Sequence, residues 1–197
     1  MVKAKKQFPL LEYNVLKETL EDIPQMEHKV LLKTIYSGCA RVGEIVRNRY
    51  QKEWKRFDFD SLTIKDKFLI LNLKTEKTHL ARKVPLSRID DPSEEYFKKN
   101  EAWLTEDLIA FYSKDKQFNW DISTRRAQQI FQKYLPEYGS HIHYLRHWRA
   151  THLRQGVATG KPIPLDIIKK IGGWTSMKVP EQTYEHSIIE DFINLGD

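Results

Sequence analysis

The string His143-Tyr144-Leu145-Arg146-His147 carries the residue types most suited to chemistry in this sequence. On a helix, side chains three and four positions apart share a face, so His143, Arg146 and His147 project together. The string alone allows three interpretations: a solvated polar helix face, a metal-binding histidine pair, or a site for an anion such as phosphate.

The residues between the two histidines weigh against a metal. His143 and His147 have the i, i+4 spacing of zinc-binding helices, but Tyr144 stands where such helices carry glutamate. The guanidinium of Arg146 would also repel a cation. An arginine can instead bind phosphate through two N–H groups, while a histidine donates a hydrogen bond or transfers a proton. The string therefore favours an anion over a metal, with the solvated face as the alternative.

A second candidate is Arg41, which stands near the expected start of a helix. An arginine there is disfavoured by the helix dipole unless it meets an anion. Glu44, three residues further on, is spaced to hold its guanidinium. The alternative is a surface ion pair that contributes little.

Composition restricts the class of protein. The chain has 197 residues, of which 40% are hydrophobic and 30% charged, and a net charge of +6. This favours a soluble globular fold and an anionic partner. The single cysteine, Cys39, excludes an intramolecular disulfide and a multi-cysteine zinc site. Neither a membrane span nor a secretory signal is evident, so we expect a cytoplasmic protein without membrane contact.

The elements that must position these residues are mostly helical. Hydrophobic periodicity predicts helices over residues 9–24 and 27–37, and a third that starts near Cys39. Residues 57–86 change to three strand-like runs separated by polar turns. After Pro92 the helical pattern returns.

Helix boundaries in the second half follow from capping residues. Thr105 and Ser123 are expected N-caps, whereas Gly156 and the pair at 172–173 are expected to end helices. Pro180 suits the first turn of a short helix that carries Tyr184. We therefore predict a mainly α fold with a small three-stranded antiparallel sheet (α+β).

Five motifs in the same order resemble the catalytic domain of the tyrosine recombinase, or phage integrase, family. They are Arg41-x-x-Glu44; Lys74 in the turn after a strand, followed by Val84-Pro85-Leu86; the string His143 to His147; Gly173-Trp174; and Tyr184 near the C-terminus. The resemblance spans about residues 27–186. Two departures are Cys39, where the family usually has glycine, and about one additional residue between Trp174 and Tyr184.

The resemblance implies a site-specific recombinase that cleaves and rejoins DNA without a metal, ATP or another cofactor. Tyr184 would attack the phosphodiester and form a 3′-phosphotyrosine, while guanidinium groups stabilise the charge that develops on the phosphate. Lys74, or alternatively Lys77, would protonate the leaving 5′ oxygen. The implied catalytic residues are Arg41, Lys74, His143, Arg146, Trp174 and Tyr184, supported by Glu44 and His147.

Candidate DNA contacts lie on the helix after Ser123 and in the turn that holds Lys77. Arginine suits phosphate, and glutamine can contact adenine edges in the major groove. The alternative is a solvated charged face. The expected contact residues are Arg125, Arg126, Gln129 and Lys77.

The resemblance also predicts how the protein is organised. Residues 1–24 would be a helix or linker remnant and residues 25–197 the catalytic domain, associated with the nucleoid. Double-stranded DNA would be the partner of a homotetramer in which the C-terminal segment docks on a neighbouring protomer. Two alternatives stay open: a DNA-relaxing enzyme resembling type IB topoisomerases, and a catalytically inactive DNA-binding module.

Overall fold

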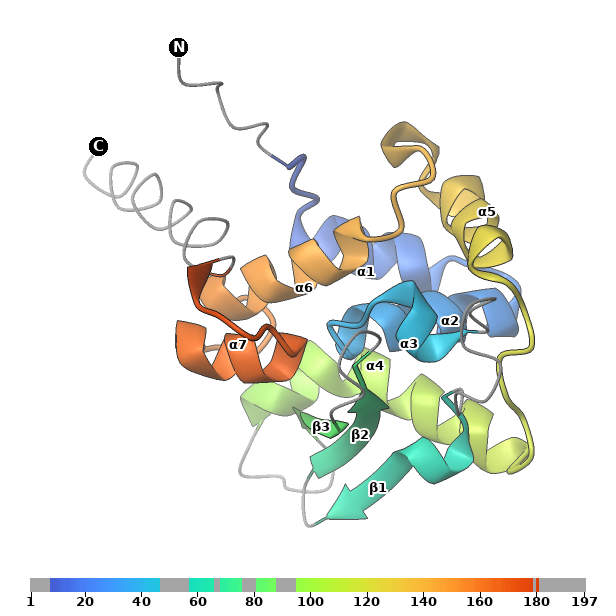
Figure 1. Cartoon of the computed structure of the whole chain (residues 1–197), viewed down its shortest axis with the longest axis horizontal. Coiled ribbons are helices and arrows are strands. Elements are labelled where there is room, and N and C mark those ends of the chain that lie inside the picture. The colour runs from blue at the N-terminus through green and yellow to red at the C-terminus, as the bar shows by residue number, and fades with distance from the viewer. Residues whose placement is uncertain are drawn as a thin grey trace.

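The computed structural model describes residues 8–46, 57–65, 68–75, 81–87, 95–178 and 180. Helices dominate this part of the chain, and one small sheet lies along one side (Figure 1). The helices are α1 (Tyr13–Glu21), α2 (Met26–Ser37), α3 (Val42–Ile45), α4 (Glu95–Lys114), α5 (Thr124–Tyr134), α6 (Tyr144–Gln155) and α7 (Leu165–Gly172), with 3-10 turns at Phe59–Ser61 and Pro136–Tyr138.

The sheet contains β1 (Leu62–Lys65), β2 (Phe68–Lys74) and β3 (Ala81–Ser87), antiparallel in that order. Leu69, Leu71 and Leu73 of β2 are buried and alternate with less buried residues, because successive side chains of a strand point to opposite faces. The buried face belongs to the same core as the helices. The predicted α+β fold with its three-stranded antiparallel sheet is thus confirmed.

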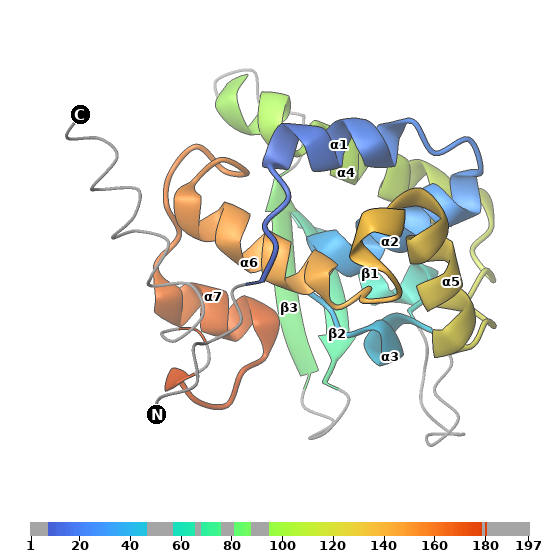
Figure 2. The same ribbon diagram turned by 90° about the horizontal axis from the view of Figure 1, so that it is seen from above.

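Helix α2 is central to the core. Val30, Leu31, Leu32 and Ile35 are at most 1% exposed, which fits a helix surrounded by other elements. It contacts α1, α4 and α6, while α7 contacts both α6 and β3 (Figures 1 and 2). The turn after α2, the start of α6 and the end of α7 are therefore held by one packed core.

Two local predictions are wrong. Thr105 is not an N-cap: it lies inside α4, and its hydroxyl donates to the carbonyl of Glu101 at 2.9 Å. The third helix begins at Val42 rather than near Cys39, because Cys39 has a left-handed backbone (φ +46°) that a right-handed helix cannot include.

Other boundaries agree with the capping pattern. The hydroxyl of Ser123 accepts a hydrogen bond from the amide of Arg126, and Gly156 and Gly173 end α6 and α7 in the left-handed conformation. Helix α1 packs its Leu16 and Leu20 into the common core. The division into residues 1–24 and 25–197 stays a prediction. No described helix is long and apolar enough to span a membrane.

Candidate functional site

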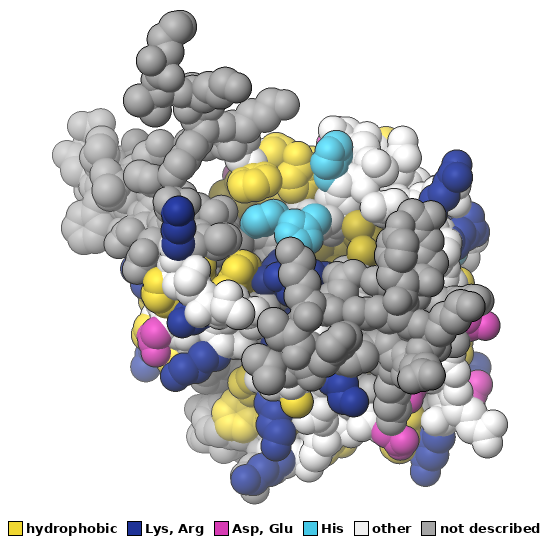
Figure 3. Space-filling view, in the orientation of Figure 1, with side chains coloured by type: hydrophobic (Ala, Val, Ile, Leu, Met, Phe, Trp, Pro, Cys, Tyr) yellow, Lys and Arg dark blue, Asp and Glu magenta, His cyan; other side chains and the backbone are white. Residues whose placement is uncertain are grey.

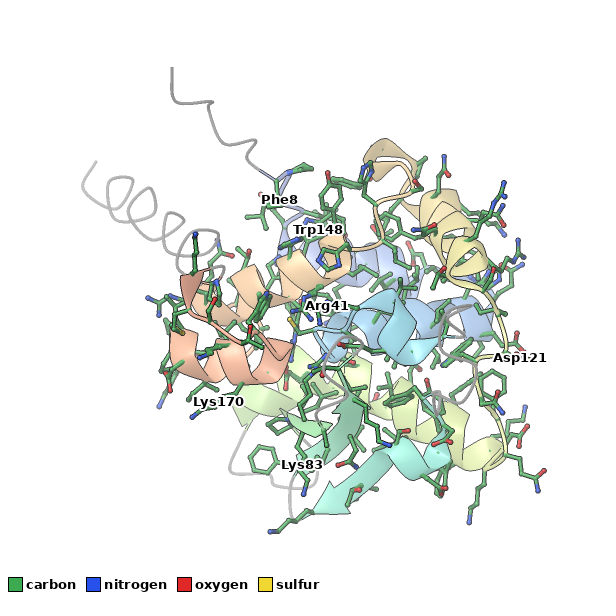
Figure 4. All side chains as sticks on the ribbon, in the orientation of Figure 1. Phe8, Arg41, Lys83, Asp121, Trp148 and Lys170 are labelled. Atoms are coloured by element: carbon green, nitrogen blue, oxygen red, sulfur yellow. The ribbon has the colours of Figure 1, made fainter. Side chains whose placement is uncertain are left out.

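The turn between α2 and α3 presents Arg41. Arg41 is the N-cap of α3, and its amide donates to Oε2 of Glu44 at 3.1 Å. Its guanidinium Nη1 donates to Oε1 of the same carboxylate at 3.2 Å, so the predicted contact between the two residues is confirmed. The Arg41 side chain is 25% exposed and is labelled near the centre of the view in Figure 4.

The start of α6 brings the predicted His–Arg–His face next to this turn. His143 is the N-cap of α6, and its ring centre lies 4.8 Å from that of His147. The ring of His147 stacks on Phe8 at 4.2 Å. Histidine side chains gather near the middle of the face in Figure 3, beside basic side chains.

Arg146 is buried, with 1% of its surface exposed. Its Nη1 donates to the carbonyl of Cys39 at 2.8 Å, and its guanidinium carbon lies 4.1 Å from the centre of the Trp174 ring. Its Nη2 has no hydrogen-bond partner among the described residues. Burial lowers the pKa of Arg146, against the smaller effect of nearby Glu44. One donor of this guanidinium is therefore unsatisfied within the described structure.

Two glycines allow Trp174 to lie over Arg146. A Cβ on Gly172 would lie 1.8 Å from the Trp174 ring, so only glycine fits at that position. Gly173 has φ +67°, which glycine adopts without steric cost. The sequence Gly-Gly-Trp thus both ends α7 and turns the indole back onto the guanidinium.

The predicted lysine lies at the end of β2. Lys74 is exposed, and the next residue, Thr75, is buried. Thr75 packs against Gly173, because a Cβ added to Gly173 would lie 2.9 Å from Cγ2 of Thr75. Lys74 is therefore the sequence neighbour of a residue that packs against the turn carrying Trp174. Lys77 and Tyr184 lie outside the described residues.

Positive charge and partial burial act on both histidines. Partial burial, followed by the charges of Arg146 and Arg41, lowers the pKa of His143 to about 4. Burial, His143 and Arg146 lower that of His147 to about 3. Both imidazoles are neutral at pH 7. A neutral imidazole can donate one hydrogen bond to a phosphate and accept another.

Arg82 is a residue of the site that sequence reasoning overlooked. Its Nη2 donates to Oε2 of Glu44 at 2.5 Å, so Arg82 and Arg41 share one carboxylate. The sequence did hold a signal: Arg82 alternates with Val84 and Leu86 on the buried face of β3. A basic residue at an inward position of a strand needs a buried partner.

The predicted DNA contacts lie on α5, which contacts α3. Arg125, Arg126 and Gln129 are all exposed there. The first two are in the first turn of α5, where the helix dipole favours an anion.

Among the described residues, no group of three His, Cys, Asp or Glu side chains could hold a metal ion.

Comparison with known proteins identifies one matching family. The model of the phage integrase family matches residues 10–190. None of the curated protein sequences is significantly similar to the chain.

Two similar solved structures are of the XerH site-specific recombinase. One is a pre-cleavage complex with a difH substrate (TM-score 0.62) and the other a post-cleavage complex with palindromic difH (TM-score 0.65), each with 16% identity. They cover 97% and 100% of this chain but only 54% and 55% of the recombinase. The chain thus shares their fold and spans about half of their length.

Proposed function

Because the chain belongs to the phage integrase family, we propose that it is a site-specific DNA recombinase that works through a covalent phosphotyrosine. The observation that carries the proposal is the state of Arg146. This residue is 1% exposed, one of its nitrogens has no partner in the described part of the chain, and no carboxylate there pairs with it. It lies beside Arg41 and His143, which contribute further donors. A phosphodiester would supply the missing negative charge.

The chemistry follows from the residues in order. The phenol oxygen of Tyr184 attacks phosphorus, and the bond to the 5′ oxygen breaks, leaving DNA joined to the protein through a 3′-phosphotyrosine. Negative charge grows on the non-bridging oxygens during this step, where Arg41 and Arg146 would stabilise it. The phenol proton of Tyr184 passes to His143 or to solvent, and His143 can also donate a hydrogen bond to the same phosphate.

The leaving oxygen needs a proton, which we assign to Lys74, with Lys77 as the alternative. Attack by a 5′ hydroxyl from another DNA end then reverses the step and releases Tyr184. The phosphotyrosine keeps the energy of the broken bond, so neither ATP nor a metal is required.

Trapping of the covalent intermediate tests the proposal. Nicked duplexes that cover the DNA on both sides of the gene lose a short fragment after cleavage, so the intermediate accumulates. We expect a protein–DNA adduct on a denaturing gel for the natural chain and for Tyr138→Phe, but none for Tyr184→Phe. Absence of any adduct would contradict the enzyme and favour a DNA-binding module, whereas site-independent relaxation of supercoiled plasmid would favour a topoisomerase-like activity.

A modified leaving group distinguishes the two lysines. A thiolate is a much weaker base than the alkoxide that leaves normal DNA, since a thiol has a pKa of about 8.5. It can therefore leave without receiving a proton from a lysine. We expect Lys74→Ala to be slow on normal DNA and fast on DNA with sulfur at the 5′ bridging position, and Lys77→Ala to be nearly normal on both. The reverse pattern would assign the proton to Lys77.

We also propose that α5 contacts the DNA through Arg125, Arg126 and Gln129. Their exposure and their place beside α3 support this contact. Replacing both arginines by alanine should weaken binding and reduce its salt dependence, because phosphate contacts release counterions. Unchanged affinity at several salt concentrations would exclude the contact.

Assembly into a tetramer through residues near the C-terminus stays a prediction, because these residues lie outside the described part of the chain. The mass of the complex on its DNA, with and without residues 192–197, tests it. An unchanged mass after this deletion would exclude docking through the tail.

A further inference from the structure

Arg82 joins three segments that hold the candidate site. It is 8% exposed. Its Nη1 donates to the carbonyls of Gly38, at 2.9 Å, and of Ile171. Its Nη2 donates to the carbonyl of Cys39, at 3.5 Å, and to the carboxylate of Glu44. One guanidinium thus contacts the turn after α2, the start of α3 and the end of α7.

Its acceptors are shared with the two arginines expected to bind phosphate. The carboxylate of Glu44 also receives Nη1 of Arg41, and the carbonyl of Cys39 also receives Nη1 of Arg146. Arg82 therefore shares one acceptor with Arg41 and another with Arg146. A shift of Arg82 would move both acceptors.

Arg82 also reaches the two remaining parts of the site. Ile171 is followed by Gly172 and Gly173, and a Cβ on Gly173 would lie 2.9 Å from Cδ of Arg82. In the sheet, Arg82 pairs with Leu73, the residue before Lys74. The turn that carries Trp174 and the strand that carries Lys74 are thus fixed relative to the same side chain.

We propose that Arg82 is a positioning residue that sets the relative placement of Arg41, Arg146, Trp174 and Lys74 around the phosphate; this rests on the proposed recombinase activity. Its planar guanidinium can serve several acceptors at once, which the single ammonium of lysine cannot do in the same geometry. Without Arg82, Glu44 loses a counter-charge. The carboxylate then holds Arg41 more tightly and reduces the positive charge available to the phosphate.

The first test compares cleavage with binding. Full-length Arg82→Lys and Arg82→Met are mixed with saturating nicked substrate, and affinity is measured in the Tyr184→Phe background. We expect cleavage to fall about 100-fold, as for small displacements of catalytic groups, and DNA affinity to change by less than about 3-fold. Normal cleavage by Arg82→Met would overturn the proposal.

Arg149→Met is the matched control. Arg149 is also a buried arginine, 1% exposed and paired with Glu101, so its loss also disturbs the core. Thermal melting identifies the folded fraction of each variant. We expect Arg149→Met to cleave at nearly the natural rate per folded molecule. If Arg82→Met does not fold, Arg82→Gln, which keeps a planar donor, replaces it.

A neutral substrate separates positioning from general structural damage. A methyl group in place of one non-bridging oxygen of the scissile phosphate removes the negative charge that Arg41 and Arg146 must meet. We expect the defect of Arg82→Met to shrink to less than about 5-fold on this methylphosphonate, because electrostatic stabilisation is then largely unnecessary. An equal defect on both substrates would overturn the assignment of Arg82 to the placement of Arg41 and Arg146. Failure of the natural chain to form an adduct would instead contradict the recombinase itself.

Discussion

Arg146 and Arg149 lie three positions apart on α6, and each is 1% exposed, but they meet different surroundings. Arg149 donates to the carboxylate of Glu101 at 2.5 Å and lies over the ring of Tyr36. Arg146 meets a carbonyl and the face of an indole, and no carboxylate pairs with it in the described part of the chain. Both arginines keep nitrogens without hydrogen-bond partners among the described residues, so the difference is the counter-charge.

The pKa values of the two groups move in opposite directions. Burial lowers the pKa of Arg146. Burial also lowers the pKa of Arg149, but the charges of Glu101 and Tyr36 and the hydrogen bond to Glu101 together outweigh it and raise that pKa. A buried charge is costly unless a partner neutralises it. Arg149 is neutralised by the fold itself. Arg146 has no such partner in the described part of the chain, so the missing counter-charge, rather than burial, distinguishes the arginine that we propose to bind phosphate from the one paired within the core.

The largest expected effect is on cleavage by Arg146→Met. Loss of one charge-stabilising group typically costs about 10²–10³ in rate, so we expect adduct formation to fall about 1000-fold. The free energy of unfolding should change by less than about 1 kcal/mol, because the lost charge had no neutralising partner. Adduct formation and urea unfolding measure the two effects. A loss of more than about 2 kcal/mol would mean that Arg146 is mainly structural.

A smaller effect, on stability alone, is expected from Glu101→Gln. The substitution leaves Arg149 as an uncompensated buried charge, which lowers the free energy of unfolding by about 3 kcal/mol. Urea unfolding measures the loss, and the double variant Glu101→Gln/Arg149→Met should recover part of it. Normal stability of Glu101→Gln would remove the contrast between the two arginines.

The smallest effect concerns two histidines with similar pKa values in different places. The pKa values of His143 and His152 are both lowered to about 4, first by burial. His152 lies on the Arg149 side and contacts Tyr36 and the carbonyl of Leu11. DNA phosphate should raise the pKa of His143 toward 6.5 or above and leave that of His152 unchanged. Imidazole resonances in NMR titrations report both values, and parallel shifts would contradict this expectation.

The lowered pKa values of the same two histidines determine how the free energy of unfolding changes with pH. Their pKa values lie below the unfolded value of about 6.5, so the unfolded chain binds protons more readily. Their contribution to stability is present above pH 6.5 and is lost as the pH falls towards 4. Bound DNA should reduce the part that comes from His143.

Much of the fold could be predicted because it depends on local patterns. The strand-like run of β2 and the capping residues Ser123 and Gly156 act within a few residues, and the structure confirms each prediction. The prediction for Thr105 is wrong because a threonine hydroxyl can either cap a helix or donate to a carbonyl four residues earlier. The buried Leu104 and Leu108 mark a helix face that continues past it.

The candidate site was predicted only as a set of separate residues. The contact between Arg41 and Glu44 is local, so spacing suggested it. Arg82 reaches Glu44 across 38 positions and Arg149 reaches Glu101 across 48. Such pairs depend on how the elements pack, which one sequence does not reveal. Residue type alone therefore could not separate Arg146 from Arg149.

Around Arg41, Arg82 and Arg146, Glu44 is the one carboxylate that forms an ion pair in the described structure. The electric field of this local excess of positive charge extends into the solvent. It attracts a polyanion over the Debye length, about 8 Å at physiological ionic strength. We therefore expect the charge that the fold leaves unneutralised also to steer the approach of DNA, and added salt to slow that encounter.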